Sequence, residues 1–184
     1  MLELAEKLTG ERIYLQRHPK TIAHAEKIMA LVKASLPEIS PWLGWATDKY
    51  AVEDMYEYLV FADSLWQRGE GYIYGIYLQD NTLIGNISIQ NVDYKNRKAE
   101  IGYWMATQYA GNGYMQEAVK TLEKVVFAAG MHRLTIRADV LNGKSCNVAL
   151  KCGYQFEGTL HGQLYAAAED RYRDMNIFAK VAGK

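Results

Sequence analysis

The chain has 184 residues, and we expect them to form one domain, residues 1–184, with a substantial core. Apolar residues make up 49% and charged residues 23%, which is ordinary for a globular protein. Lysine plus arginine equal aspartate plus glutamate, at 21 each, so bulk DNA and anionic membrane surfaces are disfavoured as partners.

Targeting signals and metal motifs are not evident. The first residues lack the basic region and apolar core of a secretory signal, and no apolar run reaches membrane-spanning length. Cys146 and Cys152 fit no zinc or redox spacing, so we expect buried thiols in the reducing cytoplasm and no metal. The histidines show no ligand spacing and are interpreted as ordinary polar or core residues: His18, His24, His132 and His161.

The N-terminal part predicts a strand, a helix and an aromatic loop. Alternating apolar residues indicate a strand over Arg12–Gln16, and helical spacing indicates a helix over Thr21–Ser35. Prolines then interrupt the chain around a segment that contains Trp42 and Trp45. These two tryptophans either pack a compact loop or form a wall of a binding site, since tryptophan is common at recognition surfaces.

A second helix is predicted over Thr47–Gln67, with a regular apolar stripe on one side. Its other side is acidic, and this charge is either a solvated face or an attraction for a cationic substrate. The acidic side carries Asp48, Glu53, Asp54, Glu57 and Asp63.

Three strands follow, over Tyr72–Leu78, Leu83–Val92 and Ala99–Met105. The connections between them are short and polar, so the three strands must be antiparallel. This arrangement disfavours a Rossmann domain, in which helices separate parallel strands.

A glycine-containing turn separates the third of these strands from an amphipathic helix. The helix is predicted from Tyr114 to a cap at Gly130, and Gly111 and Gly113 precede it. Free N–H groups and the helix dipole make such a junction a candidate phosphate site, although a simple turn would also explain the glycines. Gln116 replaces the third glycine of the dinucleotide fingerprint, and no Walker loop is present.

The C-terminal part predicts a fifth strand over Leu134–Val140, parallel to the strand before the glycine turn. A short helix is expected over Ser145–Cys152, with Asn142 and Ser145 as possible caps. Strands are then expected over Tyr154–Gly158 and Arg173–Val181, joined by a loop over Thr159–Arg171.

This order of elements resembles the GNAT superfamily of acetyl-CoA-dependent N-acetyltransferases. The resemblance rests on Gln108-x-x-Gly111-x-Gly113, Asn142-x-x-Ser145 and Gly153-Tyr154-x-x-Glu157-Gly158. The segments Ala99–Trp104 and Trp42–Trp45 also resemble the RimJ/RimL branch, which acetylates N-termini of ribosomal proteins. The resemblance covers nearly the whole chain and implies an α+β fold, with a mixed, mostly antiparallel sheet flanked by helices.

The resemblance implies where acetyl-CoA binds. Gln108 and the glycine turn would hold the diphosphate on backbone N–H groups, and the strand before the turn would pair with the pantetheine arm. Asn142 would contact the pantetheine, and Ser145 would lie near the thioester sulfur. The implied cofactor-binding residues are Tyr103, Trp104, Met105, Gln108, Gly111, Asn112, Gly113, Tyr114, Met115, Asn142 and Ser145.

The resemblance also suggests catalytic groups. Glu100 occupies the place of a carboxylate that drains protons through water, and it is our predicted base; a surface salt bridge with Arg97 or Lys98 is the alternative. Ser145 is predicted to hydrogen-bond the leaving thiolate, or else only to cap its helix. The glutamate of the RimL-type loop is replaced here by Leu164, and we leave open whether a neighbouring carboxylate, Glu169 or Asp170, substitutes for it.

The expected reaction is acetyl transfer to a primary amine. A free α-amine titrates near 8 and a lysine amine near 10.4, so an α-amine costs roughly 3 kcal/mol less to deprotonate at neutral pH. This favours a protein N-terminus as acceptor, with Trp42 and Trp45 as substrate-binding residues. A polyamine or aminoglycoside acceptor and a non-catalytic CoA-binding module are the alternatives. A homodimer is expected from the family only.

Overall fold

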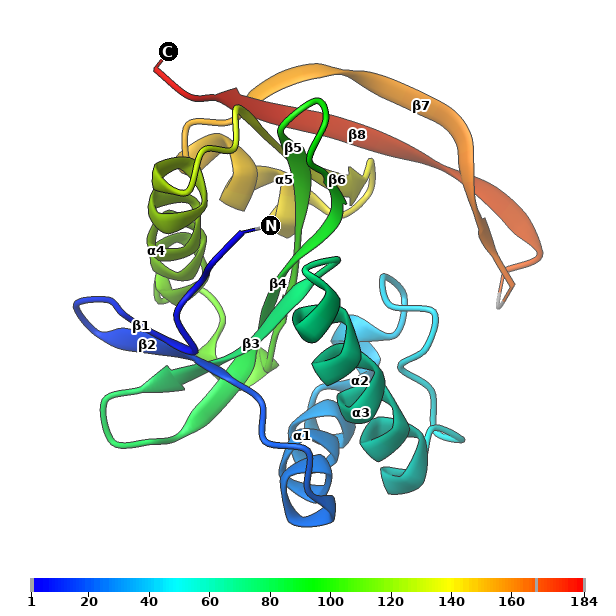
Figure 1. Ribbon diagram of the computed structural model, residues 1–184. Helices are drawn as coiled ribbons and strands as arrows, with labels where there is room; N and C mark the ends of the chain where they lie inside the picture. Colours follow the sequence, from blue (N-terminus) through cyan, green and yellow to red (C-terminus); the bar gives the residue numbers. More distant parts are fainter. Residues whose placement is uncertain (1, 168, 184) are drawn as a thin grey trace.

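The computed structural model describes residues 2–167 and 169–183. Its centre is a twisted sheet with the strand order β1-β2-β3-β4-β5-β6-β8-β7 (Figure 1). Neighbouring strands are antiparallel except β5 and β6, which run parallel. The strands are β1 (Lys7–Thr9), β2 (Ile13–Arg17), β3 (Tyr72–Leu78), β4 (Leu83–Asp93), β5 (Lys98–Met105), β6 (Arg133–Asp139), β7 (Gln155–Ala166) and β8 (Arg171–Val181).

Helices cover both faces of this sheet (Figure 1). One face carries α1 (Ile22–Ala34), α2 (Leu36–Ile39) and α3 (Val52–Arg68). The other face carries α4 (Tyr114–Ala128) and α5 (Gly143–Lys151), which follow β5 and β6 respectively. A short 3₁₀ turn, η1 (Thr107–Tyr109), joins β5 to the glycine turn. The mixed eight-stranded sheet with flanking helices agrees with the predicted fold class.

The apolar core has two parts, one on each face. The larger part packs α4 and α5 on the sheet, and it includes the alternate residues Ile87 and Ile89 of β4, both fully buried. The smaller part packs α1 and α3 over the opposite face, around Met29 and Leu59. Because successive strand residues point to opposite faces, Ser88, which lies between these isoleucines, faces the α1–α3 side.

The parallel strands β5 and β6 separate after a short paired stretch. Their register joins Lys98 with Arg133 and ends where Glu100 faces Thr135. Beyond that point β5 keeps pairing with β4 as far as Met105, and β6 keeps pairing with β8. The sheet therefore opens between β5 and β6.

The C-terminal hairpin differs from the sequence-based expectation. The predicted loop over Thr159–Arg171 is mostly strand, because β7 continues to Ala166 and pairs with β8 across a turn that begins at residue 167. Most β7 residues are exposed, so the segment lacks the alternation of buried and exposed side chains that would have identified a strand. The hairpin arches away from the body of the protein in Figure 1.

One helix boundary and two short elements also differ from the prediction. The second long helix, α3, begins at Val52 rather than at Thr47. At its observed start, the side chain of Asp54 accepts a hydrogen bond from the N–H of Ala51. The short α2 was not predicted, because Pro37 was interpreted as a breaker although proline is tolerated in the first turn of a helix. The three-residue β1 was also missed.

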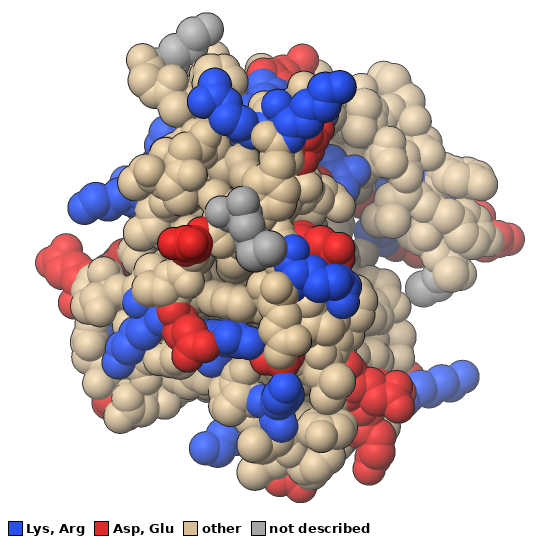
Figure 2. Space-filling model, in the orientation of Figure 1, with Lys and Arg blue, Asp and Glu red and all other residues tan. Residues whose placement is uncertain are grey.

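The surface carries both signs of charge. Figure 2 shows lysine and arginine side chains interspersed with aspartate and glutamate over one face, as the equal counts of 21 would suggest. Among the described residues, no helix is both long and apolar enough to cross a membrane.

Candidate active site

The glycine turn before α4 adopts the backbone that only glycine accepts readily. Gly111 has φ +83° and Gly113 has φ +81°, both in the left-handed region. The side chain of Asn112 turns inward and donates to the carbonyls of Tyr109 and Ala110. No side chain caps the N-terminus of α4, so its first N–H groups remain available to an anion.

Arg12 braces this turn from β2's side, which the sequence did not indicate. Its Nη1 donates to the carbonyl of Asn112 at 3.0 Å, and its Nε pairs with Glu117 at 2.9 Å. The guanidinium also lies 5.0 Å from the centroid of the Tyr114 ring. Burial opposes ionisation of Glu117, but hydrogen bonds from Arg12 and Ile13 outweigh it and hold the pKa of Glu117 below its usual value.

A main cavity of about 620 Å³ extends from the glycine turn, through the opening between β5 and β6, to the C-terminal hairpin. Most of the predicted cofactor residues line it, together with one of the two predicted substrate residues. These lining residues are Trp42, Tyr103, Trp104, Met105, Gly111, Gly113, Tyr114, Met115, Asn142 and Ser145. Gln108 is exposed and does not line the cavity, and neither does Asn112.

The N-terminus of α5 brings two hydroxyl groups together at this cavity. Asn142 is the N-cap, since its Oδ1 accepts from the N–H of Ser145 at 3.0 Å. The Ser145 hydroxyl lies 3.1 Å from the Tyr103 hydroxyl on β5. Burial raises the pKa of Tyr103 far above its ordinary value, so its hydroxyl stays protonated across the physiological range.

Glu100 lies where β5 and β6 are still paired, outside the lining of this cavity. Its carboxylate pairs with the Nε of Arg137 at 2.9 Å and accepts from Asn91 at 3.2 Å. The partner is thus on β6, and not one of the neighbours in sequence that were considered. Arg137 itself lines the main cavity, so Glu100 contacts a residue of the cavity wall without lining the cavity.

A second cavity of about 330 Å³ lies on the α1–α3 side of the sheet. Trp45 lines this cavity, so the two predicted substrate tryptophans face different spaces. The cavities share a wall that includes Tyr103 and Trp104, and the Trp45 and Trp104 rings meet edge-on at 6.3 Å. The second cavity's sheet side presents the polar residues of β4 that alternate with the buried isoleucines, namely Asn86, Ser88 and Gln90.

The carboxylates of the hairpin turn are engaged in local contacts. Glu169 pairs with Arg171 at 2.6 Å and also with Arg173, and Asp170 accepts from the Tyr165 hydroxyl. Leu164, at the place of the RimL-type glutamate, lines the main cavity.

The carboxylates that do line the main cavity are Glu38 and Asp139 among the described residues, and sequence reasoning identified neither. Asp139 ends β6 and pairs with Arg173 of β8, 34 residues further along the chain. No local motif connects two residues so far apart, so this ion pair could not be predicted from the sequence.

Of the two thiols predicted to be buried, only that of Cys152 is, whereas Cys146 is half-buried. Cys152 is buried, which raises the pKa of its thiol to about 11. Within residues 2–167 and 169–183, no cluster of histidine, cysteine and carboxylate side chains is suited to a metal ion.

Comparison with known proteins places these features in a family. The model of the acetyltransferase (GNAT) domain matches residues 12–155. The N-acetyltransferase YdaF of Bacillus subtilis is 34% identical over 145 residues, which is 77% of this chain and 78% of the relative. The ribosomal-protein-serine acetyltransferase of Escherichia coli is 29% identical over 168 residues, covering 91% and 92% of the two chains.

Solved structures show the same fold. RimL, the ribosomal L7/L12 α-N-protein acetyltransferase in complex with coenzyme A, superimposes with a TM-score of 0.88 at 24% identity, covering 96% of this chain and 98% of that one. The microcin C7 self-immunity acetyltransferase MccE, in complex with acetyl-CoA and AMP, gives 0.85 at 24% identity, with 93% of both chains covered.

The opened mixed sheet and the match to an acetyltransferase domain place the chain among the acyl-group transferases. More narrowly, the chain belongs to the GNAT acetyltransferase family, as the domain match and the 34% identical relative show.

Proposed function

We propose that this protein transfers the acetyl group of acetyl-CoA to the N-terminal α-amine of a protein, with ribosomal proteins as the first candidates. The observation that carries the proposal is the continuous cavity from the glycine turn through the β5–β6 opening to the hairpin. The name of the Escherichia coli relative supports the choice of acceptor. We also propose that the reaction takes place in the cytoplasm, and a homodimer stays a prediction.

The placement of acetyl-CoA follows from the lining of the cavity. The diphosphate would accept hydrogen bonds from N–H groups between Gly111 and Met115, at the positive end of α4. The pantetheine arm would lie in the opening between β5 and β6, beside Tyr103 and Asn142. Three basic side chains of the cavity wall would meet the remaining negative charge: Arg137, Lys144 and Lys151.

The chemistry requires an aligned amine, polarisation of the carbonyl and a proton on the leaving thiolate. A free N–H of β5 would polarise the thioester carbonyl as an oxyanion hole does. The Ser145 hydroxyl, supported by the protonated Tyr103, would hydrogen-bond the leaving sulfur. Glu100 stays our proposed proton acceptor, acting through water, because its carboxylate does not reach the main cavity directly.

The acceptor would approach from the α1–α3 side, opposite the helix that holds the diphosphate. The loop after α2 lies on that side and lines both the hairpin end of the main cavity and the second cavity, whose described lining contains no carboxylate that would attract a polyamine. On α3, Asp63 is already paired with Arg17 and Lys20, and Asp54 caps its own helix. Two of the five residues of the acidic face are thus engaged locally, so the choice of a peptide α-amine is supported chiefly by the lining of the second cavity.

Acetyl transfer to a panel of amines tests this proposal. The panel contains peptides with free N-terminal serine, alanine or threonine, the same peptides with a blocked N-terminus and an internal lysine, and a polyamine and an aminoglycoside. We expect mass spectrometry to find acetylation of the free peptide N-termini. Acetylation of the small amines alone would contradict the proposed acceptor, and CoA binding without turnover on any amine would favour a binding module.

A further inference from the structure

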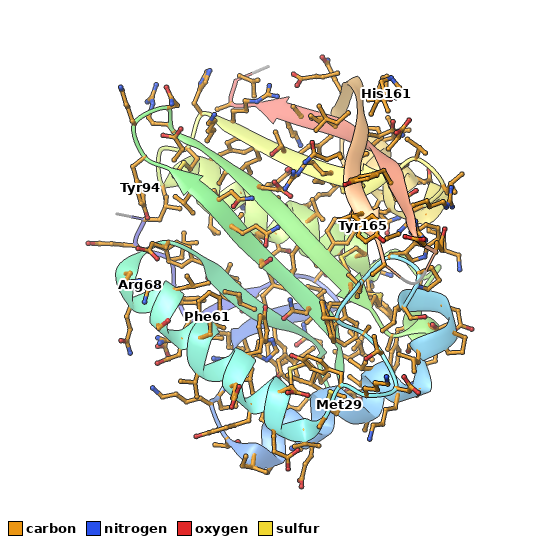
Figure 3. The ribbon with its side chains drawn as sticks, turned by 90° about the vertical axis from the view of Figure 1, so that its right-hand side faces the viewer. Met29, Phe61, Arg68, Tyr94, His161 and Tyr165 are labelled. Carbon is orange, nitrogen blue, oxygen red and sulfur yellow. The ribbon has the colours of Figure 1, made fainter. Side chains whose placement is uncertain are left out.

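Arg173 on β8 is a buried cation that joins separate parts of the chain at the hairpin end of the main cavity. Its side chain is only 5% exposed. One Nη atom donates to the carbonyl of Pro41 at 2.5 Å and to Asp139 at 3.3 Å, and the other pairs with Glu169. Figure 3 shows the end of the hairpin around Tyr165 reaching the loop that follows α2.

These contacts connect the loop after α2 to two segments that the sheet already holds together, since β6 and β8 are paired as far as Asp139 and Met175. The Pro41 carbonyl belongs to the loop after α2, Asp139 ends β6, and Glu169 lies in the hairpin turn. Asp139 is itself 5% exposed, and its other carboxylate oxygen accepts from the N–H of Leu141 at 2.8 Å. Removing one partner of a buried ion pair leaves an uncompensated buried charge, which is strongly destabilising. We therefore expect the Arg173 guanidinium to keep these segments in their present positions.

The same guanidinium sets the position of a cavity wall. It lies 5.6 Å from the centroid of the Trp42 ring, and Trp42 lines the main cavity. Directly opposite Arg173 across the hairpin stands Leu164, which lines the cavity too. Arg173 Nε is buried without a hydrogen-bond partner among the described residues, so the contacts that fix this side chain are those of its two Nη atoms and the ring.

We propose that Arg173 is a positioning residue for the acceptor: its contacts with Pro41, Trp42 and Asp139 fasten the loop after α2 to the hairpin and so form the acceptor end of the cavity. The inference rests on the proposed acetyl transfer. The glycine turn that would hold acetyl-CoA makes no contact with this cluster. Loosening the cluster should therefore change acceptor binding and leave coenzyme binding intact.

The kinetic test compares the variants Arg173→Met and Arg173→Lys with the wild-type protein. We expect kcat/KM for the best peptide acceptor to fall about tenfold in R173M, mostly through KM, because a displaced loop removes contacts that bind the acceptor equally in the ground state and the transition state. The calorimetric Kd for CoA should stay within about twofold. R173K keeps the charge but not the planar fork, so it should recover only part of the loss.

Arg171→Met is the matched control, since Arg171 lies on the same strand, pairs with the same Glu169 and is 52% exposed. It should leave all of these constants unchanged. An equal loss of kcat/KM in R171M and R173M would overturn the positioning role. So would a rise in the Kd for CoA in R173M that is as large as its loss of kcat/KM.

Hydrogen exchange measured by mass spectrometry provides a readout that does not depend on activity. In R173M, amides of residues 40–46 should exchange faster, whereas those of β4 and β5 should not. Faster exchange throughout the chain would show a general stabilising role and overturn the inference. If the wild-type protein acetylates no α-amine, the proposed function fails, and the exchange result still decides whether Arg173 fastens the loop.

Discussion

Glu100 shows how one carboxylate can fit two roles. Its ion pair with Arg137 at 2.9 Å and its hydrogen bond from Asn91 hold it at the point where β5 and β6 separate. A carboxylate there can accept a proton through water, or it can simply hold Arg137 in the cavity wall. The two roles predict different responses to changes at the two ends of the pair.

We expect Glu100→Gln to lower kcat about a hundredfold at pH 7, within the range for loss of a general base. The loss should shrink as the pH rises above the acceptor's pKa of about 8, because the amine then arrives without its extra proton. Arg137→Gln is the matched variant, and it should retain most of kcat because it keeps the carboxylate. Initial rates across pH measure both. Equal losses at every pH would assign Glu100 only to holding Arg137.

The junction between η1 and α4 is the element that we propose binds the coenzyme diphosphate. Gly113 immediately precedes α4 with φ +81°, and Gly130 follows its end with φ +96°. Both glycines therefore carry the same conformational requirement at opposite ends of one helix. A Cβ at Gly113 would lie 3.3 Å from the brace at Arg12 Nη2, whereas a Cβ at Gly130 would meet nothing within 4 Å.

This symmetry gives a controlled experiment. Gly113→Ala and Gly130→Ala should each destabilise the protein by about 1 kcal/mol, since both force a side chain into the left-handed region. Only G113A should weaken CoA binding, by about tenfold, because only that turn presents N–H groups to the diphosphate. Urea unfolding and calorimetric titration measure the two effects. Similar losses of CoA affinity in both variants would separate coenzyme binding from the turn.

At the scale of the whole molecule, a buried histidine pair links stability to pH. The Nδ1 of His18 lies 2.7 Å from the Nε2 of His24, and its Nε2 lies 2.7 Å from the Asn86 Oδ1. Burial is the main reason that the pKa of His18 falls to about 4, and it also lowers the pKa of His24. The folded state therefore keeps His18 neutral at a pH where the unfolded chain would protonate it.

Stability should accordingly fall as the pH drops from about 6.5 towards 4, since the unfolded chain binds the extra proton first. Between pH 7 and pH 5 we expect His18 to account for about 2 kcal/mol of that loss. The free energy of unfolding in urea at both pH values measures it. His18→Gln should shrink the difference between the two values, and His161→Gln, whose side chain is 82% exposed, should leave it unchanged. An unchanged difference in H18Q would contradict the expectation.

Local patterns in the sequence were sufficient for most of the fold. The apolar period of α4, the glycines at both of its ends and the cap at Asn142 depend on residues a few positions apart, and the structure confirms them. The antiparallel strands β3, β4 and β5 followed from their short connections. The strands at the base of the β7–β8 hairpin were predicted, but its outer part was predicted as a loop because most side chains of β7 there are exposed and carry no periodic signal.

What only the tertiary structure decided is which distant side chains meet. Glu100 finds Arg137, Arg173 finds Asp139 and the Pro41 carbonyl, and Arg12 finds the turn at Asn112. The partners in each pair are separated by dozens of residues in the sequence. The ion pairs of Glu100 with Arg137 and of Arg173 with Asp139 form because the order β5-β6-β8-β7 brings late strands beside early ones. The sequence by itself determined most of the elements, the family and the glycine turn. The acceptor end of the cavity depends on long-range contacts, which no local pattern encodes.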